Sequence, residues 1–187
     1  MRNGNSGETG GVARSVLVLG GARSGKSRLA EEIALGLPPP RVYVATAEAL
    51  DDEMAARIAR HRADRGEDWI TVEAPRDLAR VLAAPPRAGV VLVDCLTLWL
   101  SNLMLAGTPT GPAFDDLEAA LERAPVPVVL VSNEVGQGIV PDNALARAFR
   151  DLQGNLNRRV AARADRVVLA VAGLALELKP AAAGGAR

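Results

Sequence analysis

The amino-acid sequence predicts an α/β fold built on a doubly wound, mostly parallel β-sheet. Five short runs of apolar, largely β-branched residues recur along the chain, and segments with helical patterns lie between them. Each run is nearly continuous rather than alternating, which is typical of strands buried on both faces. Strands that alternate with helices in this way form parallel sheets with helices on both sides.

The five runs predict strands over residues 15–20, 41–46, 89–95, 126–132 and 165–173. Helices are expected over residues 27–37, 51–65, 75–84, 97–105, 113–123 and 143–164. Pro38–Pro40 end the first helix and Gly66 ends the second, because proline cannot continue a helix and glycine favours its C-terminus. The sequence GTPTGP at 107–112 predicts a turn-rich surface loop.

A single domain is expected over residues 15–179, since a chain of 187 residues suits one hydrophobic core. Residues 1–14 are rich in glycine, serine, asparagine and charge, and predict a disordered tail. Residues 180–187 predict a frayed C-terminal tail.

The composition argues against several classes of function. The 22 basic and 22 acidic residues balance, and aromatic residues make up 3%, so neither nucleic acid nor anionic lipid is an expected partner. One cysteine and one histidine cannot form an intrachain disulfide or a zinc site, which favours a cytoplasmic location. No apolar run reaches the ~20 residues of a membrane span. The first residues lack the apolar stretch of a signal peptide.

The sequence GGARSGKS follows the first expected strand and opens the first expected helix. It fits the pattern G-x-x-x-x-G-K-[ST], in which backbone N–H groups surround phosphate oxygens and the lysine reaches the β- and γ-phosphates. The alternative is an ordinary glycine-rich turn. We predict a nucleoside triphosphate site in a fold of P-loop NTPase (RecA-like) type. Its contacts are expected from Gly20, Gly21, Ala22, Arg23, Ser24, Gly25, Lys26 and Ser27.

The run VVLVDC places Asp94 at the end of a buried strand. After a P-loop, an acidic residue in this place is typical of a Walker B strand. We therefore predict that Asp94 and Ser27 hold Mg²⁺ or its water shell. The alternative is that Asp94 only caps the following segment. Cys95 is expected to be a small buried apolar residue.

His61 is the only histidine, and it lies among Arg57, Arg60, Arg62 and Arg65. On a helix, Arg57, His61 and Arg65 share one face, so periodicity alone favours a solvated surface histidine. The other interpretation is a nucleophile, because a neutral imidazole can attack a phosphoryl centre. The arginines would favour the neutral form and stabilise charge on the phosphoryl oxygens. These residues alone leave both interpretations open.

Longer stretches add a family resemblance. They are GGARSGKSRLAE (20–31), VYVATAEALDDEMAARIARHRADRGEDWITVE (42–73), VDCLTLWLSNLM (93–104), VSNEVGQGIVPDNALARAFRDLQGNLNRRVAARAD (131–165) and VAGLALELK (171–179). They resemble the bifunctional adenosylcobinamide kinase / adenosylcobinamide-phosphate guanylyltransferase family of cobalamin biosynthesis. The resemblance runs in order from about residue 15 to residue 179. SNEVGQGIVP and the Asp-Asp-Glu-Met segment are specific to that family, whereas the P-loop is general.

The resemblance implies two linked reactions. ATP or GTP phosphorylates the hydroxyl on the aminopropanol arm of adenosylcobinamide, and GMP from GTP is then transferred to that phosphate. The resemblance also implies a homotrimer and a guanylylated histidine. His61 is the only candidate for the latter, because Arg60 stands where some relatives carry a second histidine. Further nucleotide contacts are implied at Thr46, Ala47, Glu48, Arg62, Ala63, Asp64, Arg65 and Glu73.

The sequence SNEVGQGIVPDN (132–143) follows another expected strand. Loops at the carboxyl ends of strands in an open α/β sheet face the ligand crevice, so Asn133 and Glu134 are expected near the corrinoid or its phosphate. The alternative is a structural loop, since glycine and proline are common in ordinary turns.

Two other functions remain open from the residues alone. One is a single-function P-loop kinase of small molecules, in which His61 is a surface residue. The other is a non-catalytic RecA-like NTPase module. That module would need a nucleic-acid surface, which neither charge nor aromatic content offers.

Overall fold

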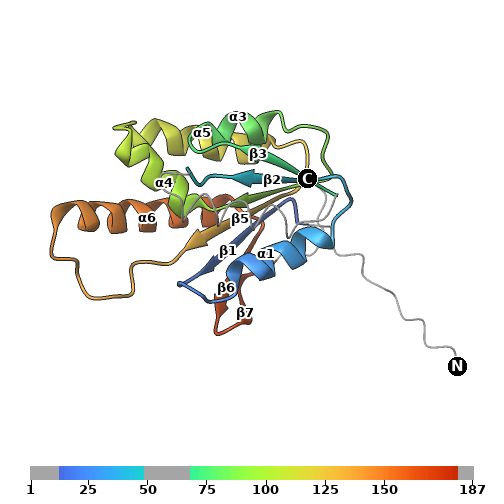
Figure 1. The fold of residues 1–187 in the computed structure, drawn as a ribbon. Helices are drawn as coiled ribbons and strands as arrows, with labels where there is room; N and C mark the ends of the chain where they lie inside the picture. Colours follow the sequence, from blue (N-terminus) through green and yellow to red (C-terminus); the bar gives the residue numbers. More distant parts are fainter. Residues whose placement is uncertain (1–12, 49–67, 181–187) are drawn as a thin grey trace, which may run out of the picture.

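A computed structural model describes residues 13–48 and 68–180. Its centre is a seven-stranded sheet in the order β3-β2-β4-β5-β1-β6-β7 (Figure 1). Among the described strands, β7 alone is antiparallel to its neighbour. The prediction of a doubly wound, mostly parallel sheet is confirmed. The strands are β1 (Ser15–Gly20), β2 (Arg41–Ala45), β3 (Trp69–Glu73), β4 (Val90–Asp94), β5 (Val128–Asn133), β6 (Arg166–Val171) and β7 (Leu174–Lys179).

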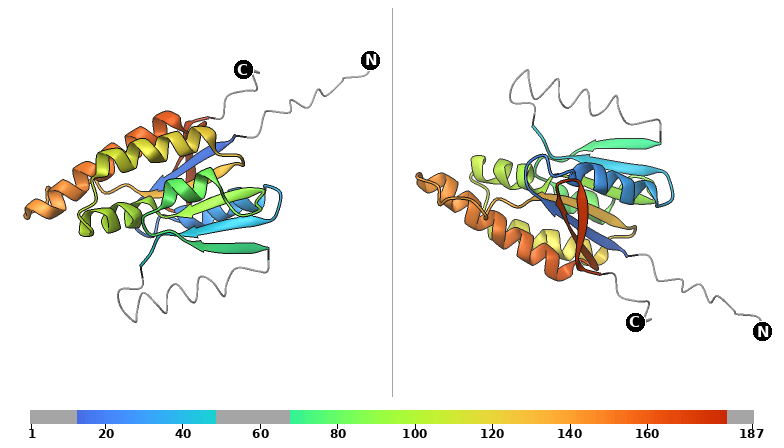
Figure 2. Two further views of the ribbon diagram at one scale, coloured as in Figure 1. Left: turned by 90° about the horizontal axis from the view of Figure 1, so that it is seen from above. Right: turned by 90° about the horizontal axis from the view of Figure 1, so that it is seen from below.

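Helices cover both faces of the sheet (Figures 1 and 2). One face carries α1 (Lys26–Leu35). The opposite face carries α3 (Leu78–Ala83), α4 (Leu96–Leu105), α5 (Thr110–Arg123) and α6 (Ala144–Arg163). No helix in the described part of the chain has the length and apolar character that a membrane crossing requires.

Alternate residues of the central strands serve two separate cores. In β1, Leu17 and Leu19 pack with α3–α6, whereas Val16 and Val18 pack toward α1. Because both faces are covered, every position along such a strand is buried, and the strand reads as a continuous apolar run. This arrangement explains why five strands could be predicted from the sequence.

The sequence does not predict the outer strands β3 and β7. β3 is only partly buried, and every residue of β7 is exposed, so neither forms a continuous apolar run. The prediction of a surface loop at 107–112 is partly wrong, because α5 begins at Thr110. Pro112 fits there because the first turn of a helix does not need its N–H. The helix expected over 51–65 and most of the expected tails, 1–14 and 180–187, lie outside the described residues.

Two basic side chains bind carbonyl groups at the C-terminal ends of helices, where no partner exists within the helix. The guanidinium of buried Arg41 donates to three carbonyl oxygens at and just after the end of α1, at 3.0–3.2 Å. The ammonium of Lys179 donates to carbonyl oxygens at the end of α6. Positive charge is also favoured there by the helix dipole. Lys179, one of only two lysines, therefore has a structural position.

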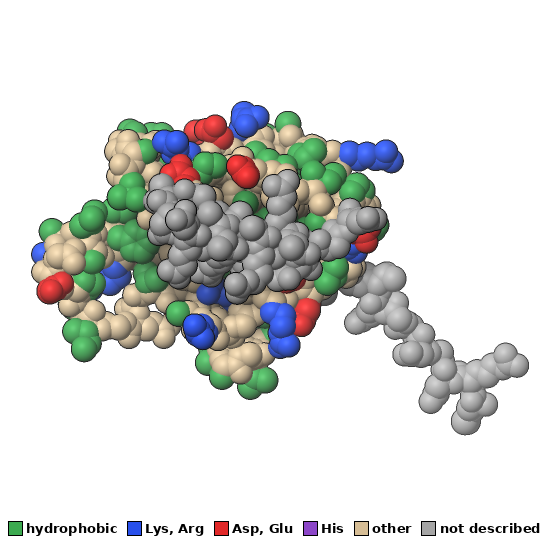
Figure 3. Space-filling model, viewed as in Figure 1, with side chains coloured by type: hydrophobic (Ala, Val, Ile, Leu, Met, Phe, Trp, Pro, Cys, Tyr) green, Lys and Arg blue, Asp and Glu red, His purple; other side chains and the backbone are tan. Residues whose placement is uncertain are grey.

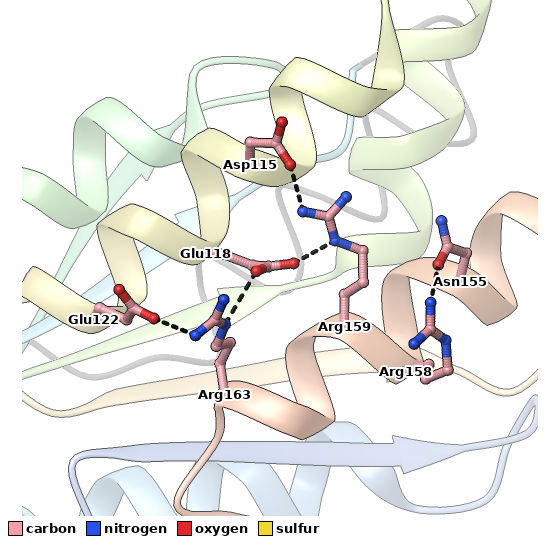
Figure 4. Close-up of polar contacts among 7 residues, drawn as sticks. All are labelled: Asp115, Glu118, Glu122, Asn155, Arg158, Arg159 and Arg163. Atoms are coloured by element: carbon pink, nitrogen blue, oxygen red, sulfur yellow. Dashed lines mark hydrogen bonds and ion pairs between the residues drawn. The ribbon is translucent and has the colours of Figure 1, made fainter.

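An ion-pair network joins α5 to α6 (Figure 4). Arg159 donates to Glu118 and, at 2.5 Å, to Asp115. Arg163 pairs with Glu118 at 3.0 Å and with Glu122 at 2.6 Å. Burial by itself would raise the pKa of Glu118, but hydrogen bonds from the two arginines outweigh it and hold this pKa below its usual value.

The change Glu118→Gln is expected to lower the free energy of unfolding by about 1 kcal/mol near neutral pH, the upper end for such pairs. Because the pKa of the folded carboxyl is lowered, its contribution is present above the unfolded pKa, about 4.3. The contribution is lost as the pH falls through the folded value. Urea unfolding between about pH 3 and pH 7 should show that the difference in free energy of unfolding between the wild type and Glu118→Gln becomes smaller in acid. A difference independent of pH would contradict this, and the more exposed Glu122→Gln serves as the weaker control.

Candidate nucleotide-binding site

The P-loop begins where β1 ends and closes into the first turn of α1. A Cβ added to Gly20 would lie 2.3 Å from Ser24 Oγ and 2.8 Å from the carbonyl oxygen of Ala170. Gly25 precedes α1 with a φ of +91°, in the left-handed region that favours glycine. Both glycines of the motif therefore occupy positions that disfavour a side chain.

The start of α1 has the features of an anion site. Gly25 offers no side chain to accept hydrogen bonds from the first N–H groups of the helix, and such groups bind phosphate together with the helix dipole. Lys26 Nζ donates to the carbonyl oxygen of Gly21 at 3.1 Å, which places the ammonium over the loop. Ser27 follows and is partly exposed. The loop can therefore surround the phosphates of a nucleotide with N–H groups and one positive charge.

The turn between β6 and β7 packs against the P-loop. The N–H of Gly173 donates to the carbonyl oxygen of Ser24 at 2.9 Å, and a Cβ on Gly25 would lie 3.3 Å from Gly173 Cα. Ala172 and Gly173 have φ values of 51° and 81°, as in two-residue hairpin turns. This support for the P-loop was not predicted, although Ala-Gly between two apolar runs is a signal from which a hairpin could have been predicted.

Asp94 ends β4, which β5 separates from β1. It pairs in register with Ala45 of the core on the α1 side, so its side chain lies on the face that carries α1. Its Oδ2 accepts a hydrogen bond from the Tyr43 hydroxyl at 2.6 Å. Cys95 is buried, as expected of a small apolar residue. Burial, with the charge of Asp94, raises the pKa of its thiol.

Ser27 and Asp94 have the chemistry of a magnesium site. A hydroxyl and a carboxylate are oxygen ligands of the kind that Mg²⁺ takes beside nucleotide phosphates, and one or two carboxylates suffice for it. Both residues belong to the α1 side of the sheet. Within residues 13–48 and 68–180, no three histidine, cysteine, aspartate or glutamate side chains gather into a metal-binding group.

Three predicted nucleotide contacts, Thr46, Ala47 and Glu48, follow β2. Thr46 is fully buried, and its Oγ1 donates to the carbonyl oxygen of Cys95 and accepts from its N–H, each at 2.8 Å. The Thr46 side chain therefore joins the ends of β2 and β4. Glu48 forms an ion pair with Arg76 at 3.5 Å. Nucleotide contact at these three residues stays a prediction.

Glu73 is exposed at the end of β3 and lines a cleft of about 680 Å³. Arg76, Trp99 and Asp116 also line this cleft. Trp99 is almost wholly buried and donates its indole N–H to the carbonyl oxygen of Arg76 at 2.8 Å, so it belongs to the core. A nucleotide contact at Glu73 stays a prediction.

The end of β5 lies beside the P-loop. The N–H of Glu134 donates to the carbonyl oxygen of Gly20 at 3.1 Å, and that of Asn133 donates to Thr97 Oγ1 at 2.8 Å. The side-chain oxygen of Asn133 is buried without a hydrogen-bond partner in the structure. The backbone thus brings the suspected acceptor-binding residues to the phosphate loop, while their contact with a corrinoid stays a prediction.

Residues of α6 that were not among the predicted site residues hold this end of β5. Ser132 Oγ donates to Asn157 Oδ1 at 2.6 Å, and Gln153 Nε2 donates to both of these oxygens at 2.9 Å. Asn157 Nδ2 donates to the carbonyl oxygen of Asn133 at 2.9 Å. Gln153 and Asn157 lie four apart on the buried side of α6. Amides at that spacing within an apolar stripe are the signal that could have indicated a polar contact with the sheet.

Charged side chains of both signs are spread over the face of the molecule in Figure 3. The mixture of both signs on the described part of this face is in keeping with the balanced composition of the chain.

The remaining predicted site residues, His61, Arg62, Ala63, Asp64 and Arg65, lie outside the described residues.

Comparison with known proteins agrees with the family resemblance. Residues 16–178 match the family described as CobU, cobinamide kinase / cobinamide phosphate guanyltransferase. The bifunctional adenosylcobalamin biosynthesis protein CobU of Salmonella typhimurium is 46% identical over 182 residues, which cover 88% of this chain and 99% of that protein. Its counterpart CobP of Pseudomonas aeruginosa is 48% identical over 167 residues, covering 87% and 96%.

A solved structure supports the fold. It is an ATPase from the type III secretion system of pathogenic bacteria, with a TM-score of 0.53 and 14% identity. The alignment covers 88% of this chain and 56% of that one. Similarity at this identity bears on the fold alone, and it is in keeping with the α/β fold class that the sequence predicts.

Proposed function

Because this chain belongs to the cobinamide kinase / cobinamide phosphate guanyltransferase family, we propose that it carries out both reactions on adenosylcobinamide. In the first, the aminopropanol hydroxyl receives the γ-phosphoryl group of ATP or GTP. In the second, GMP from GTP is transferred to the new phosphate, which gives adenosyl-GDP-cobinamide and pyrophosphate.

The observation that carries the kinase step is the geometry of the P-loop. The N–H groups at the start of α1, which receive no side-chain cap, and the ammonium of Lys26 can hold the β- and γ-phosphates while the acceptor hydroxyl attacks. Negative charge grows on the phosphate oxygens as the bond to the leaving diphosphate breaks. Lys26 stabilises that charge as a point charge.

The second step is proposed to use His61 as a nucleophile. An imidazole nitrogen attacks the α-phosphorus of GTP, the bond to the β-phosphate oxygen breaks, and pyrophosphate leaves. An oxygen of the corrinoid phosphate then attacks the same phosphorus, and the phosphorus–nitrogen bond breaks to release the histidine. Four arginines lie close to His61 in the sequence, and they are proposed to supply positive charge for both transfers: Arg57, Arg60, Arg62 and Arg65.

Mg²⁺ is proposed to be held beside the nucleotide by Ser27 and Asp94, where it would shield the charge of the phosphates. The change Asp94→Asn is then expected to lower phosphorylation of adenosylcobinamide by roughly 100-fold, because a ligand of the metal is lost. It should also raise the Mg²⁺ concentration needed for half-maximal rate. Initial rates across a Mg²⁺ titration check this. Wild-type behaviour at limiting Mg²⁺ would mean that Asp94 is only a cap.

The proposed function itself is tested by product analysis. The protein is incubated with GTP, Mg²⁺ and adenosylcobinamide, and the corrinoids are separated and identified by mass. Adenosylcobinamide phosphate followed by adenosyl-GDP-cobinamide is the expected sequence of products. If adenosylcobinamide phosphate is the final product even when GTP is in excess, the protein is instead a single-function kinase.

A cytoplasmic homotrimer completes the proposal. The single cysteine suits a reducing compartment, and the trimer rests on family resemblance. Light scattering of the purified protein tests the trimer, because a mass other than three chains would contradict it.

A further inference from the structure

We propose that Tyr43 is a positioning residue for phosphoryl transfer: its phenol fixes the Asp94 carboxylate in the orientation that meets Mg²⁺ beside the nucleotide. This inference rests on the metal role proposed for Asp94 and extends it to a residue that acts through Asp94.

The sheet brings the two side chains together. Tyr43 on β2 pairs in register with Leu92 of β4, and Ala45 pairs with Asp94, so Tyr43 and Asp94 are diagonal neighbours. Diagonal neighbours on one face of a sheet are within reach of an aromatic side chain. The Tyr43 hydroxyl therefore extends toward the carboxyl end of β4, where it donates to Asp94 Oδ2 at 2.6 Å. That length lies within the ordinary range of O–H···O hydrogen bonds.

Packing keeps the phenol in place. Tyr43 is 5% exposed and belongs to the core on the α1 side of the sheet. Its ring meets that of Trp69 edge to face, with centroids 6.3 Å apart and an interplanar angle of 77°. Because this packing restricts movement of the Tyr43 ring, the hydroxyl keeps one position from which it donates to Asp94 Oδ2.

The backbone next to Asp94 is held as well. Thr46 Oγ1 binds both the N–H and the carbonyl oxygen of Cys95 at 2.8 Å, and Asn102 Nδ2 binds the carbonyl oxygen of Thr46 at 2.7 Å. The main chain and one carboxylate oxygen of Asp94 are thereby fixed. Since the two oxygens of a carboxylate point in different directions, fixing Oδ2 also fixes the direction of Oδ1. A preset ligand direction suits Mg²⁺, which demands nearly ideal geometry.

A spectroscopic test leaves Tyr43 itself unsubstituted. The chain contains one tyrosine, so growth with 3-fluorotyrosine places the fluorine label at Tyr43 alone. In the full-length protein with ATP bound, the ¹⁹F resonance is expected to move when Mg²⁺ replaces EDTA. The Mg²⁺-dependent part of that movement should be absent in Asp94→Asn. A resonance that ignores Mg²⁺ while MgATP is bound would overturn the inference.

A kinetic test uses Tyr43→Phe, which keeps the packing of the ring and removes the donor. The Mg²⁺ concentration for half-maximal kinase activity is expected to rise roughly tenfold, as for other groups that orient a metal ligand. Nucleotide affinity measured in EDTA should stay unchanged. In the Asp94→Asn background, Tyr43→Phe should have little further effect, because a residue acting through Asp94 cannot act without it.

A matched control separates positioning from stability. Ser15→Ala also removes a buried hydroxyl, which donates to the Asp165 carboxylate. Ser15 lies at the start of β1, away from the end that leads into the P-loop. Ser15→Ala should therefore lower the free energy of unfolding without changing the Mg²⁺ concentration that half-maximal activity requires. If Tyr43→Phe behaves like Ser15→Ala while Asp94→Asn raises the requirement, the inference is wrong and the metal role of Asp94 stands. If neither Tyr43→Phe nor Asp94→Asn raises it, both are wrong.

Discussion

Replacing His61 with alanine is expected to abolish covalent labelling of the protein by α-labelled GTP and with it the transfer of GMP. The only imidazole in the chain is removed, and no other histidine can form the phosphorus–nitrogen bond. Phosphorylation of adenosylcobinamide by ATP should persist within a fewfold, because the P-loop does not include His61. The measurement is gel autoradiography after incubation with Mg²⁺ and no acceptor, paired with an ATP-dependent kinase assay.

The chemical stability of the adduct provides a second criterion. A phosphorus–nitrogen bond is stable in base and labile in acid, so the wild-type label should be lost in acid alone. Arg60→His is a useful companion, since it adds a second histidine next to His61, and labelling should survive there. Labelling of His61→Ala would mean that His61 is a surface residue and that another nucleophile is used.

Lys26→Ala is expected to lower the rate of phosphorylation at least 100-fold, as when other charge-stabilising groups of a transition state are removed. Nucleotide binding should weaken, because the β- and γ-phosphates lose their point charge. The fold should survive, since the contact of the Lys26 ammonium is a hydrogen bond to an exposed carbonyl of the same loop. Such surface changes alter the free energy of unfolding by about 0.5 kcal/mol or less. Initial rates and urea unfolding measure the two effects.

The other lysine is the matched control. Lys179 binds carbonyl groups at the end of α6. Lys179→Ala should therefore reduce stability and leave the kinase rate largely intact, the reverse of the Lys26 result. Near-normal phosphorylation by Lys26→Ala would overturn the P-loop assignment.

The predictability of the fold follows from burial. Strands covered on both faces, such as β1 and β4, must be apolar at every position and can be recognised without any knowledge of their partners. The outer strand β7 has no such constraint, and only its pairing with β6 defines it. Alternation in Leu174–Lys179 is compatible with a strand but does not by itself distinguish a strand from an exposed tail.

The candidate site divides in a similar way. The P-loop could be predicted because its chemistry is local: adjacent residues supply the turn, the N–H groups and the ammonium. The hydrogen bond of Tyr43 to Asp94 and the support of Gly25 by Gly173 depend on which strands are neighbours, and no local pattern encodes them. Residues 61–65 lie outside the described residues, and their proposed roles come from the sequence and the family resemblance.

Transfer of a preformed label to the acceptor shows whether a guanylylated His61 is an intermediate. The protein is first guanylylated with α-labelled GTP and freed of nucleotide by gel filtration, and adenosylcobinamide phosphate is then added alone. We expect the label to leave the protein and to appear in adenosyl-GDP-cobinamide at a rate no slower than overall turnover. Label that stays on the protein, while fresh GTP still supports formation of the product, would contradict a guanylylated His61 as the intermediate.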